Sequence, residues 1–222
     1  MNQNPLEFYW PHAYGCDGKN CSTNTINCED SFKHQYTIKG CPQFLFHTSL
    51  ANVRLFLGSN RVGKTCCGTV EVLFHLTGFY PSWYPKERRY DRAVKGRILA
   101  SDFKKAVGEV ITTSLDEWIP KSLLEAKDKN NQGIYDKYFI KHKSGQISTF
   151  DIVTYEQDIG VCEGWAGDFL WYDEPPPQGH RIASARGLID RNGWEIFTLT
   201  PLREAWIYDQ LYMRSNLLGG LN

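Results

Sequence analysis

Eight consecutive residues match the phosphate-loop pattern G-x-x-x-x-G-K-[ST] at every fixed position: Gly58, Ser59, Asn60, Arg61, Val62, Gly63, Lys64 and Thr65. An apolar run over residues 53–57 precedes them and predicts a buried strand. Residues 65–77 follow and predict a helix that ends at Gly78. In such a strand-loop-helix unit, successive backbone N–H groups point into one concavity at the positive end of the helix dipole. The sequence therefore predicts a site for the phosphates of a nucleotide.

Two side chains of this motif carry the expected contacts with a magnesium-nucleotide. Lys64 is expected to reach the β- and γ-phosphates, and the Thr65 hydroxyl is expected to bind Mg²⁺. The alternative, a glycine-rich turn that matches by chance, is disfavoured because the motif is complete and lies between a strand and a helix.

A second apolar run supplies the acidic half of the predicted site. Residues 169–172 predict a buried strand that ends in Asp173 and Glu174, because the three prolines that follow cannot extend a sheet. Open α/β sheets bind ligands at the carboxyl ends of their strands, so both motifs should meet at one edge. Asp173 is expected to hold Mg²⁺ together with Thr65, and Glu174 to activate a water molecule against the γ-phosphate.

Composition limits the classes of partner. The 222 residues suffice for one α/β domain with an ample core. The 25 basic and 25 acidic residues cancel, so any contact with nucleic acid must come from a local patch. No apolar stretch approaches the length that spans a bilayer, and the first 14 residues lack the features of a signal peptide. We expect an intracellular protein without membrane contact.

Residues 1–41 predict an irregular, cysteine-containing segment that precedes the α/β domain of residues 42–222. Part of this segment, residues 10–31, is polar and shows neither helical nor strand periodicity. Four cysteines could supply ligands to a structural Zn²⁺, but the tight C-x-x-C pairs typical of such sites are missing, and reduced thiols are the alternative. These candidate ligands are Cys16, Cys21, Cys28 and Cys41.

Periodicity predicts the remaining elements of a mostly parallel sheet flanked by helices. Strands are expected over residues 95–100, 138–143, 146–155 and 194–199, and helices over residues 102–113, 118–126, 179–190 and 205–216. Gln43 could present an amide donor and acceptor to adenine, or be an ordinary surface glutamine. A hydroxyl at the end of the last strand, Thr198 or Thr200, could sense the γ-phosphate, or simply be a threonine that favours strands.

These motifs resemble those of the large terminase subunits of tailed bacteriophages, which are ATP-driven motors that package DNA into procapsids. The resemblance rests on residues 42–47, 58–65, 75–81, 171–176 and 198–202 and covers about residues 42–203. Its most specific part is the Leu-Thr-Gly-x-Tyr-Pro sequence of residues 76–81, which other phosphate-loop ATPases lack.

The resemblance implies a P-loop NTPase fold of the additional-strand, catalytic-glutamate (ASCE) type. It also implies double-stranded DNA, the portal protein and the small terminase subunit as partners, in the cytoplasm of the host cell. The subunit would form a homo-oligomeric ring on the portal and be monomeric alone. By the same resemblance, Gln43 corresponds to an adenine-reading glutamine, and Arg61 to a loop arginine that stabilises or senses charge. Thr198 and Thr200 correspond to the motif that couples hydrolysis to movement.

Two departures from the family pattern affect these expectations. Residues 156–160 contain no arginine where relatives often carry a finger that reaches the neighbouring subunit, which leaves Arg186 or Arg191 as candidates. The chain also ends before an RNase-H-like nuclease domain could begin. We therefore expect an isolated ATPase domain, or one subunit of a split motor, that does not cut DNA.

Two other classes of protein stay open at this point. One is a helicase or recombination ATPase with a different nucleic-acid substrate, and the other is a nucleotide-gated scaffold with little turnover. A small-molecule kinase is disfavoured, because such enzymes do not need an Asp-Glu pair at a strand end. Candidates for DNA contact follow from charge alone and are Lys86, Arg88, Arg89, Lys104 and Lys105.

Overall fold

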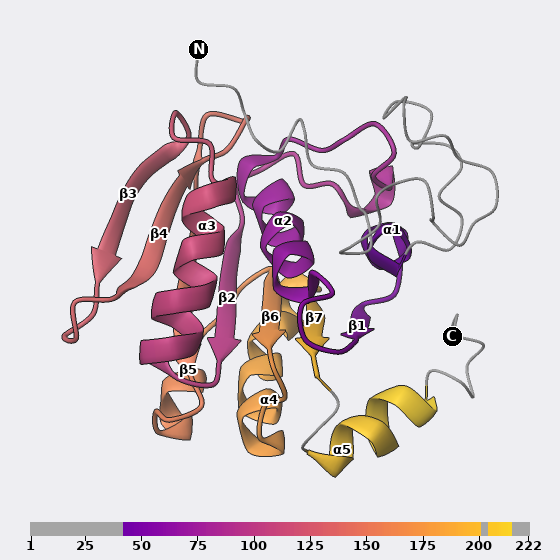
Figure 1. Ribbon diagram of the computed structural model, residues 1–222. Helices are drawn as coiled ribbons and strands as arrows, with labels where there is room; N and C mark the ends of the chain where they lie inside the picture. Colours follow the sequence, from indigo (N-terminus) through magenta and orange to yellow (C-terminus); the bar gives the residue numbers. More distant parts are fainter. Residues whose placement is uncertain (1–41, 201–203, 215–222) are drawn as a thin grey trace.

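One seven-stranded sheet organises the computed structural model, which describes residues 42–200 and 204–214 (Figure 1). Its strand order is β1-β7-β6-β2-β5-β4-β3. The first five strands in this order are parallel to one another, and the last two continue the sheet in antiparallel pairs. The strands are β1 (Val53–Leu57), β2 (Lys95–Ala100), β3 (Leu124–Lys129), β4 (Tyr135–Lys141), β5 (Ile147–Thr154), β6 (Phe169–Asp173) and β7 (Trp194–Leu199).

The position of β7 defines the type of fold. It pairs in parallel with β1, which leads into the phosphate loop, and with β6, which ends in the acidic pair. An additional strand therefore lies between the two strands that carry the nucleotide motifs, as the ASCE type requires. The predicted fold class is confirmed.

Helices cover both faces of the sheet in a three-layer arrangement (Figure 1). On one face lie α2 (Lys64–Thr77) and a continuous helix made of η4 (Phe103–Ile111) and α3 (Thr112–Trp118). The other face packs against α4 (Gln178–Ala185), η6 (Arg186–Arg191) and the start of the last helix. The remaining elements are α1 (Pro42–Thr48), η3 (Lys86–Arg88), η5 (Ile159–Cys162), α5 (Ala205–Ile207) and η7 (Tyr208–Tyr212).

Two aromatic-rich cores separate these layers. Leu73, Phe74 and Trp171 lie in the core between α2 and the sheet, and all three side chains are fully buried. Tyr172 and Phe197 lie in the core on the opposite face, where their rings stack with centroids 4.5 Å apart. Alternate residues of β6 thus serve opposite cores, and the strand that carries the acidic pair is buried on both sides. None of the helices among residues 42–200 and 204–214 is long and apolar enough to cross a membrane.

Most of the predicted elements are confirmed, several with identical bounds, but the helix predicted over residues 118–126 is wrong. The preceding helix ends at Trp118, and Ile119 is extended, as expected for a residue before a proline. Residues 124–129 then form β3, which pairs antiparallel with β4. The partner strand decides this structure, because an edge strand gains backbone hydrogen bonds that local sequence cannot show.

Candidate nucleotide-binding site

The phosphate loop connects the end of β1 to the start of α2, as predicted. Gly63 has φ 80°, a left-handed conformation that glycine adopts without the penalty of a Cβ atom, and α2 begins at the next residue. The Lys64 ammonium crosses the loop and donates to the Ser59 carbonyl at 2.9 Å. Gly58 N–H donates to the carbonyl of Leu199 at 3.2 Å, so the loop is also attached to the end of β7.

Arg61 lies exposed in the same loop. Its φ of 67° is uncommon for a residue with a side chain and costs on the order of 1–3 kcal/mol. Such strain is characteristic of ligand-binding loops, whose backbone must present its N–H groups inward. The loop that would hold the phosphates therefore carries an exposed guanidinium group at Arg61.

Asp173 joins the phosphate loop to β7. Its carboxylate lies at the end of β6 and accepts hydrogen bonds from the hydroxyls of Thr65, at 3.1 Å, and Thr198, at 2.8 Å. Thr198 in turn accepts a 2.7 Å hydrogen bond from the Trp171 indole. Asp173 therefore directly contacts two other residues that were predicted to act at the site, and the three residues come from three separate elements.

Burial raises the pKa of Asp173 from its ordinary value to about 6. The hydrogen bonds from the Thr198 and Thr65 hydroxyls and the charge of Lys64 oppose this rise, whereas the neighbouring Glu174 adds to it. A cation bound beside the carboxylate would favour its ionised form. A hydroxyl and a carboxylate side by side are also the hard oxygen ligands that Mg²⁺ prefers, with water completing its shell. The residues present therefore fit Mg²⁺.

Clusters of protein ligands for a resident metal are not found elsewhere in the described parts of the chain. There, no group of three or more His, Cys, Asp or Glu side chains is arranged to hold an ion. The cysteines proposed as zinc ligands all precede residue 42 and lie outside the described residues, so that proposal is untested.

Glu174 is held in a strained conformation directly after β6. Its φ is 68°, and its N–H donates to the carbonyl of Thr198 at 3.0 Å. Its carboxylate accepts from the N–H of Thr200 at 3.0 Å and from the Thr200 hydroxyl at 3.1 Å. The Tyr155 hydroxyl, which has one proton to donate, lies 2.9 Å from the Glu174 carbonyl and 3.1 Å from the Leu99 carbonyl. Contacts from the ends of β5 and β7 thus fix both the backbone and the carboxylate, as a catalytic carboxylate requires.

Thr200 also reaches the phosphate loop. Its hydroxyl oxygen lies 3.2 Å from Oδ1 of Asn60 and 3.1 Å from Oε1 of Glu174. The hydroxyl has one proton and can donate it to only one of these two acceptors. If the Asn60 side-chain amide is flipped, its NH₂ group donates to the Thr200 hydroxyl instead. A shift of the phosphate loop would therefore change the position of Glu174 through one intervening residue, Thr200.

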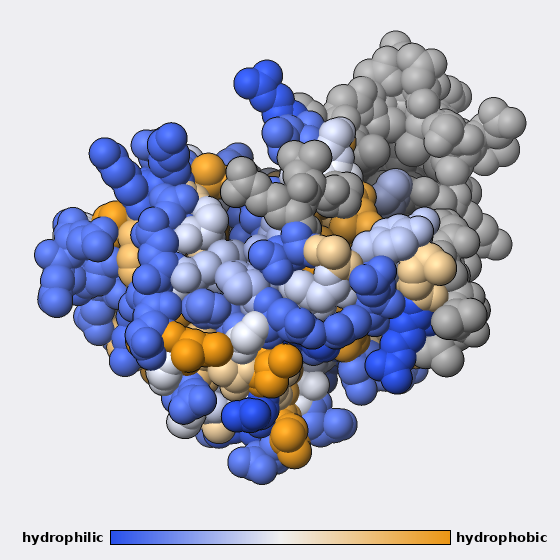
Figure 2. Space-filling view, turned by 90° about the horizontal axis from the view of Figure 1, so that it is seen from below, coloured by the Kyte–Doolittle hydropathy of each residue, from blue (hydrophilic) through white to orange (hydrophobic). Residues whose placement is uncertain are grey.

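Figure 2 shows the surface from the side at which the parallel strands end, and hydrophilic residues dominate it.

Comparison with known proteins agrees with this geometry. The sequence profile of the family "Terminase large subunit, T4likevirus-type, N-terminal" matches residues 55–213. The chain belongs to this terminase family. The large terminase subunit of Salmonella phage P22 is 28% identical over an alignment of 182 residues that covers 67% of this chain and 36% of that protein. This terminase chain thus spans about a third of the length of the curated relative that it matches.

Solved terminase structures share the fold. The large terminase ATPase domain of Thermus phage P74-26 superimposes with a TM-score of 0.57 at 20% identity, over 83% of this chain and 74% of that one. The large terminase of another thermophilic bacteriophage gives a TM-score of 0.62 at 13% identity, over 81% and 44% of the two chains. A further crystal form of that second protein contains ADP and gives a TM-score of 0.56 at 13% identity, over 83% and 41%. At these identities the likeness shows the fold alone.

The two arginines proposed to act on a neighbouring subunit lie apart from the acidic pair. Arg186 is exposed at the start of η6. Arg191 lies 3.3 Å from the buried carboxylate of Asp168, just before the start of β7. Because the strands are parallel, that position is at the edge opposite Glu174. Either arginine could therefore reach only the nucleotide site of another subunit. This role of Arg186 or Arg191 stays a prediction.

Arg88 and Arg89, candidates for DNA contact by charge, are engaged within the terminase chain itself. Arg88 donates to the carbonyls of Leu50 and Ala51, and Arg89 donates to the carbonyl of Pro81 at 3.0 Å. Arg88 therefore attaches η3 to the loop that follows α1, and Arg89 holds the turn of residues 79–85 that follows α2.

A buried ionic cluster around Glu71 was not predicted from the sequence. Glu71 lies in the middle of α2 and is fully buried. Its carboxylate contacts the Arg54 guanidinium, the Nδ1 of His47 and the Tyr84 hydroxyl, each at 2.6 Å. Burial opposes its ionisation, yet the charge of Arg54 and hydrogen bonds from two histidines hold the pKa of Glu71 well below its ordinary value.

This Glu71 cluster positions the start of the domain against the phosphate-loop helix. His47 belongs to α1, and the helix begins at Pro42 with Gln43 in its first turn. Gln43 is buried, with 4% of its surface exposed. Through His47, Glu71 attaches the helix that carries the predicted adenine-reading glutamine to α2. The sequence signal for this cluster was one acidic residue within the apolar run of residues 70–76. An acidic side chain buried by such a run requires buried hydrogen-bonding or charged partners.

Proposed function

We propose that this terminase chain binds ATP with Mg²⁺ and hydrolyses it to ADP and phosphate. The observation that carries the proposal is the juxtaposition of two carboxylates with the phosphate loop. Asp173 accepts a hydrogen bond from Thr65 of the loop, and the adjacent Glu174 is oriented by Thr200, which itself lies beside Asn60 of the loop. Adjacent acids in contact with such a loop suit nucleoside triphosphate hydrolysis.

The chain's own residues divide the chemistry between them. The loop N–H groups and Lys64 would hold the phosphates and offset the negative charge that develops on the leaving ADP oxygen. Thr65 and Asp173 would hold Mg²⁺, which supplies further charge neutralisation when bound. Glu174 would accept a proton from the water that attacks the γ-phosphorus, as the bond between that phosphorus and the β,γ-bridging oxygen breaks. Arg61 would stabilise the γ-phosphate oxygens.

Hydrolysis would be coupled to movement through the end of β7. Thr198 contacts the metal-binding carboxylate, and Thr200 contacts the proposed base. The two hydroxyls therefore lie where a change in the γ-phosphate would alter their hydrogen bonds. The segment that continues toward α5 would move with them.

We propose further that this movement drives double-stranded viral DNA into procapsids. Membership of the terminase family supports this use of the ATPase site. On this proposal the chain acts in the host cytoplasm within a ring docked on the portal protein, together with the small terminase subunit. An arginine such as Arg186 or Arg191 would act between subunits of that ring.

Steady-state ATP hydrolysis over a protein concentration series, with and without duplex DNA, tests this function. We expect Mg²⁺-dependent turnover that duplex DNA stimulates more than single-stranded DNA does. Lys64→Met should lose ATP binding and turnover, whereas the control Lys121→Met, which removes an exposed lysine elsewhere, should retain both. ATP binding without turnover at any protein concentration would contradict the enzymatic proposal and favour a nucleotide-gated scaffold. Greater stimulation by single-stranded DNA would favour a helicase.

A rate per subunit that rises with protein concentration would indicate that a neighbouring subunit completes the site. Arg186→Ala and Arg191→Ala would then identify the contributing residue. A rate per subunit that does not change with protein concentration would indicate that Arg61 of the same chain stabilises the transition-state charge. Arg61→Ala should then reduce turnover on the order of 10²-fold or more.

A further inference from the structure

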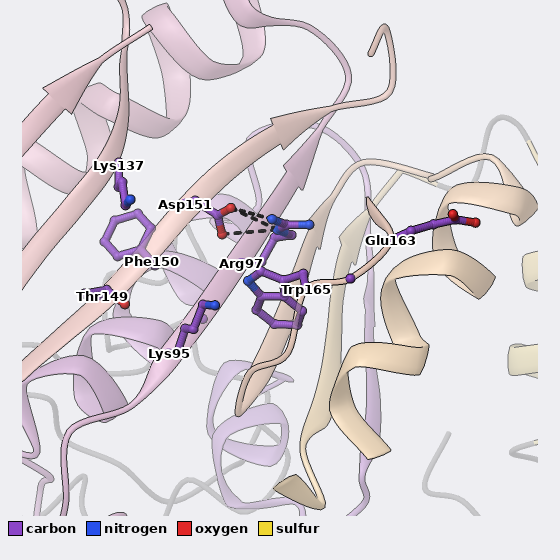
Figure 3. Close-up of a pocket in the computed structure, with 10 residues that line it drawn as sticks. Lys95, Arg97, Lys137, Thr149, Phe150, Asp151, Glu163 and Trp165 are labelled. Carbon is purple, nitrogen blue, oxygen red and sulfur yellow. Dashed lines mark hydrogen bonds and ion pairs between the residues drawn. The ribbon is translucent and has the colours of Figure 1, made fainter. Parts of the chain in front are cut away.

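A second polar pocket lies on the sheet face opposite α2 and α3 (Figure 3). It is a cavity of about 280 Å³ between the strands β2, β5 and β4 and the loop that precedes β6. Its polar lining consists of Lys95, Arg97, Lys137, Thr149, Asp151, Glu163 and Trp165. Figure 3 shows the Glu163 carboxylate directed away from Lys95 and Arg97. None of these residues belongs to the nucleotide site.

The register of the sheet places these side chains in two adjacent rows. Asp151 of β5 pairs with Arg97 of β2 on one side and with Lys137 of β4 on the other. Two residues earlier on the same strand, Thr149 pairs with Lys95. Residues two apart on a strand point to the same face, so Lys95, Arg97 and Lys137 surround Asp151, and Asp128 of β3 pairs with Lys137 on its other side.

The Asp151 carboxylate is bound by Arg97. The Arg97 guanidinium contacts Asp151 through Nη2 at 2.6 Å and Nε at 3.1 Å, and its Nη1 donates to a backbone carbonyl. Within the described ranges, the ammonium groups of Lys95 and Lys137 are in no ion pair with a carboxylate. Both ammonium groups are therefore available to contact an anion.

Trp165 adds a third donor. The residue is 7% exposed, and its buried indole N–H finds no hydrogen-bond acceptor among residues 42–200 and 204–214. Trp165 packs closely against the backbone of Gly187, which leaves the indole little room to move. A Cβ atom at Gly187 would lie only 2.1 Å from the Trp165 carbonyl oxygen and 2.8 Å from the ring. Figure 3 shows the indole nitrogen turned toward the Lys95 side chain. A buried donor without a partner costs about 1–3 kcal/mol, so it indicates a place for an acceptor.

The pocket selects against a nucleobase as its ligand. Arg97 and Lys95 lie over the Trp165 ring, 4.9 and 5.8 Å from a ring centroid, so cations rather than open space border the aromatic faces. What the pocket presents is N–H and ammonium donors, which match the oxygens of an anion.

We propose that this pocket receives a carboxylate side chain from an acidic segment of a protein partner. A cavity of about 280 Å³ admits one or two side chains, whereas a rigid DNA duplex cannot lower its backbone into it. Docking on this sheet face would place the acid between Lys95 and Lys137, with the indole N–H of Trp165 as an additional donor.

The position of the pocket separates it from ATP chemistry. Lys95 is the first residue of β2, whereas the phosphate loop and Glu174 follow the last residues of β1 and β6. Because β1, β7, β6 and β2 are parallel, Lys95 lies near the opposite edge of the sheet. Changes at Lys95 and Lys137 should therefore leave basal ATP hydrolysis unchanged.

The indole N–H of Trp165 gives a direct test by two-dimensional ¹H–¹⁵N NMR. Its cross-peak is assigned by its disappearance in Trp165→Phe. Titration of the full chain with a tetraglutamate peptide should shift this cross-peak saturably. In the double variant Lys95→Met/Lys137→Met the affinity should fall about tenfold or more, because two charge-assisted contacts are lost. The control Lys104→Met/Lys105→Met removes the same charge from exposed positions on η4 and should bind as the parent does.

Three outcomes would overturn the proposal. One is a Trp165 cross-peak that does not respond to the peptide, and another is equal affinity in the Lys95/Lys137 variant and the parent. The third is a saturable shift with a short duplex DNA and none with tetraglutamate, which would assign the face to nucleic acid. Retained dispersion of the other cross-peaks in the double variant confirms that it folds.

Discussion

Because the Asp173 carboxylate is buried, its ionised form should lower the free energy of unfolding of the metal-free protein. Its pKa in the folded chain is about 6, against an ordinary value of 3.8, and the difference corresponds to about 3 kcal/mol. Because the folded pKa is the higher one, the cost is absent below about pH 4, grows as pH rises, and is complete above about pH 6. Stability is therefore lost with rising pH at this residue.

Asp173→Asn tests this reasoning, because it removes the charge and keeps the acceptor. Both hydroxyl contacts are made to Oδ1, which the amide oxygen can replace. Urea unfolding in EDTA should find the variant more stable than the parent, and the difference should widen by about 1.5 kcal/mol between about pH 5 and pH 7.5. Saturating Mg-ATP should reverse the order at neutral pH, since the parent alone binds the metal well. A stability difference that does not change with pH would refute the reasoning.

Three other substitutions test separate parts of the account. Glu71→Gln leaves the Arg54 guanidinium buried without its counter-charge, so urea unfolding should show a loss of about 3–5 kcal/mol, and a loss below 1 kcal/mol would contradict the ionic cluster. Tyr155→Phe removes the donor to the Glu174 carbonyl, so kcat should fall several-fold at an unchanged KM for ATP; an unchanged kcat would exclude a positioning role. Thr198→Val removes a hydrogen bond that lowers the pKa of Asp173, so the acidic limb of the pH-rate profile should move to higher pH, and an unmoved limb would argue against the contact.

Much of the fold could be predicted because the decisive elements are local in sequence. The strands predicted over residues 53–57, 95–100 and 194–199 have the same bounds in the structure, because each contains consecutive apolar residues within a short segment. The helix after the phosphate loop likewise ends at Thr77, where Gly78 adopts the left-handed conformation of a helix cap. The edge strand at residues 124–129 could not be predicted, since its structure depends on pairing with β4.

The acidic pair and the phosphate loop were predicted to meet because parallel strands end at a common edge, and the structure brings Asp173 to Thr65. Supporting residues were harder to predict. The contact of Tyr155 with the Glu174 backbone depends on how β5 and β6 lie on either side of β2, which no local pattern records. The cluster around Glu71 joins residues from α1, β1, α2 and the turn after α2, so only the assembled core shows it.

The most direct test of the proposed ATPase site is to measure ATP affinity and single-turnover hydrolysis with Glu174→Gln. The amide keeps the size of the side chain and can still accept the hydrogen bond from the Thr200 N–H, but it is not a base. ATP affinity should stay within about threefold of the parent, while the hydrolysis rate should fall by about 10²-fold or more. The control Glu109→Gln, at an exposed position of η4, should change neither quantity. Undiminished hydrolysis by Glu174→Gln would contradict the assignment of Glu174 as the base and, with it, the proposed mechanism.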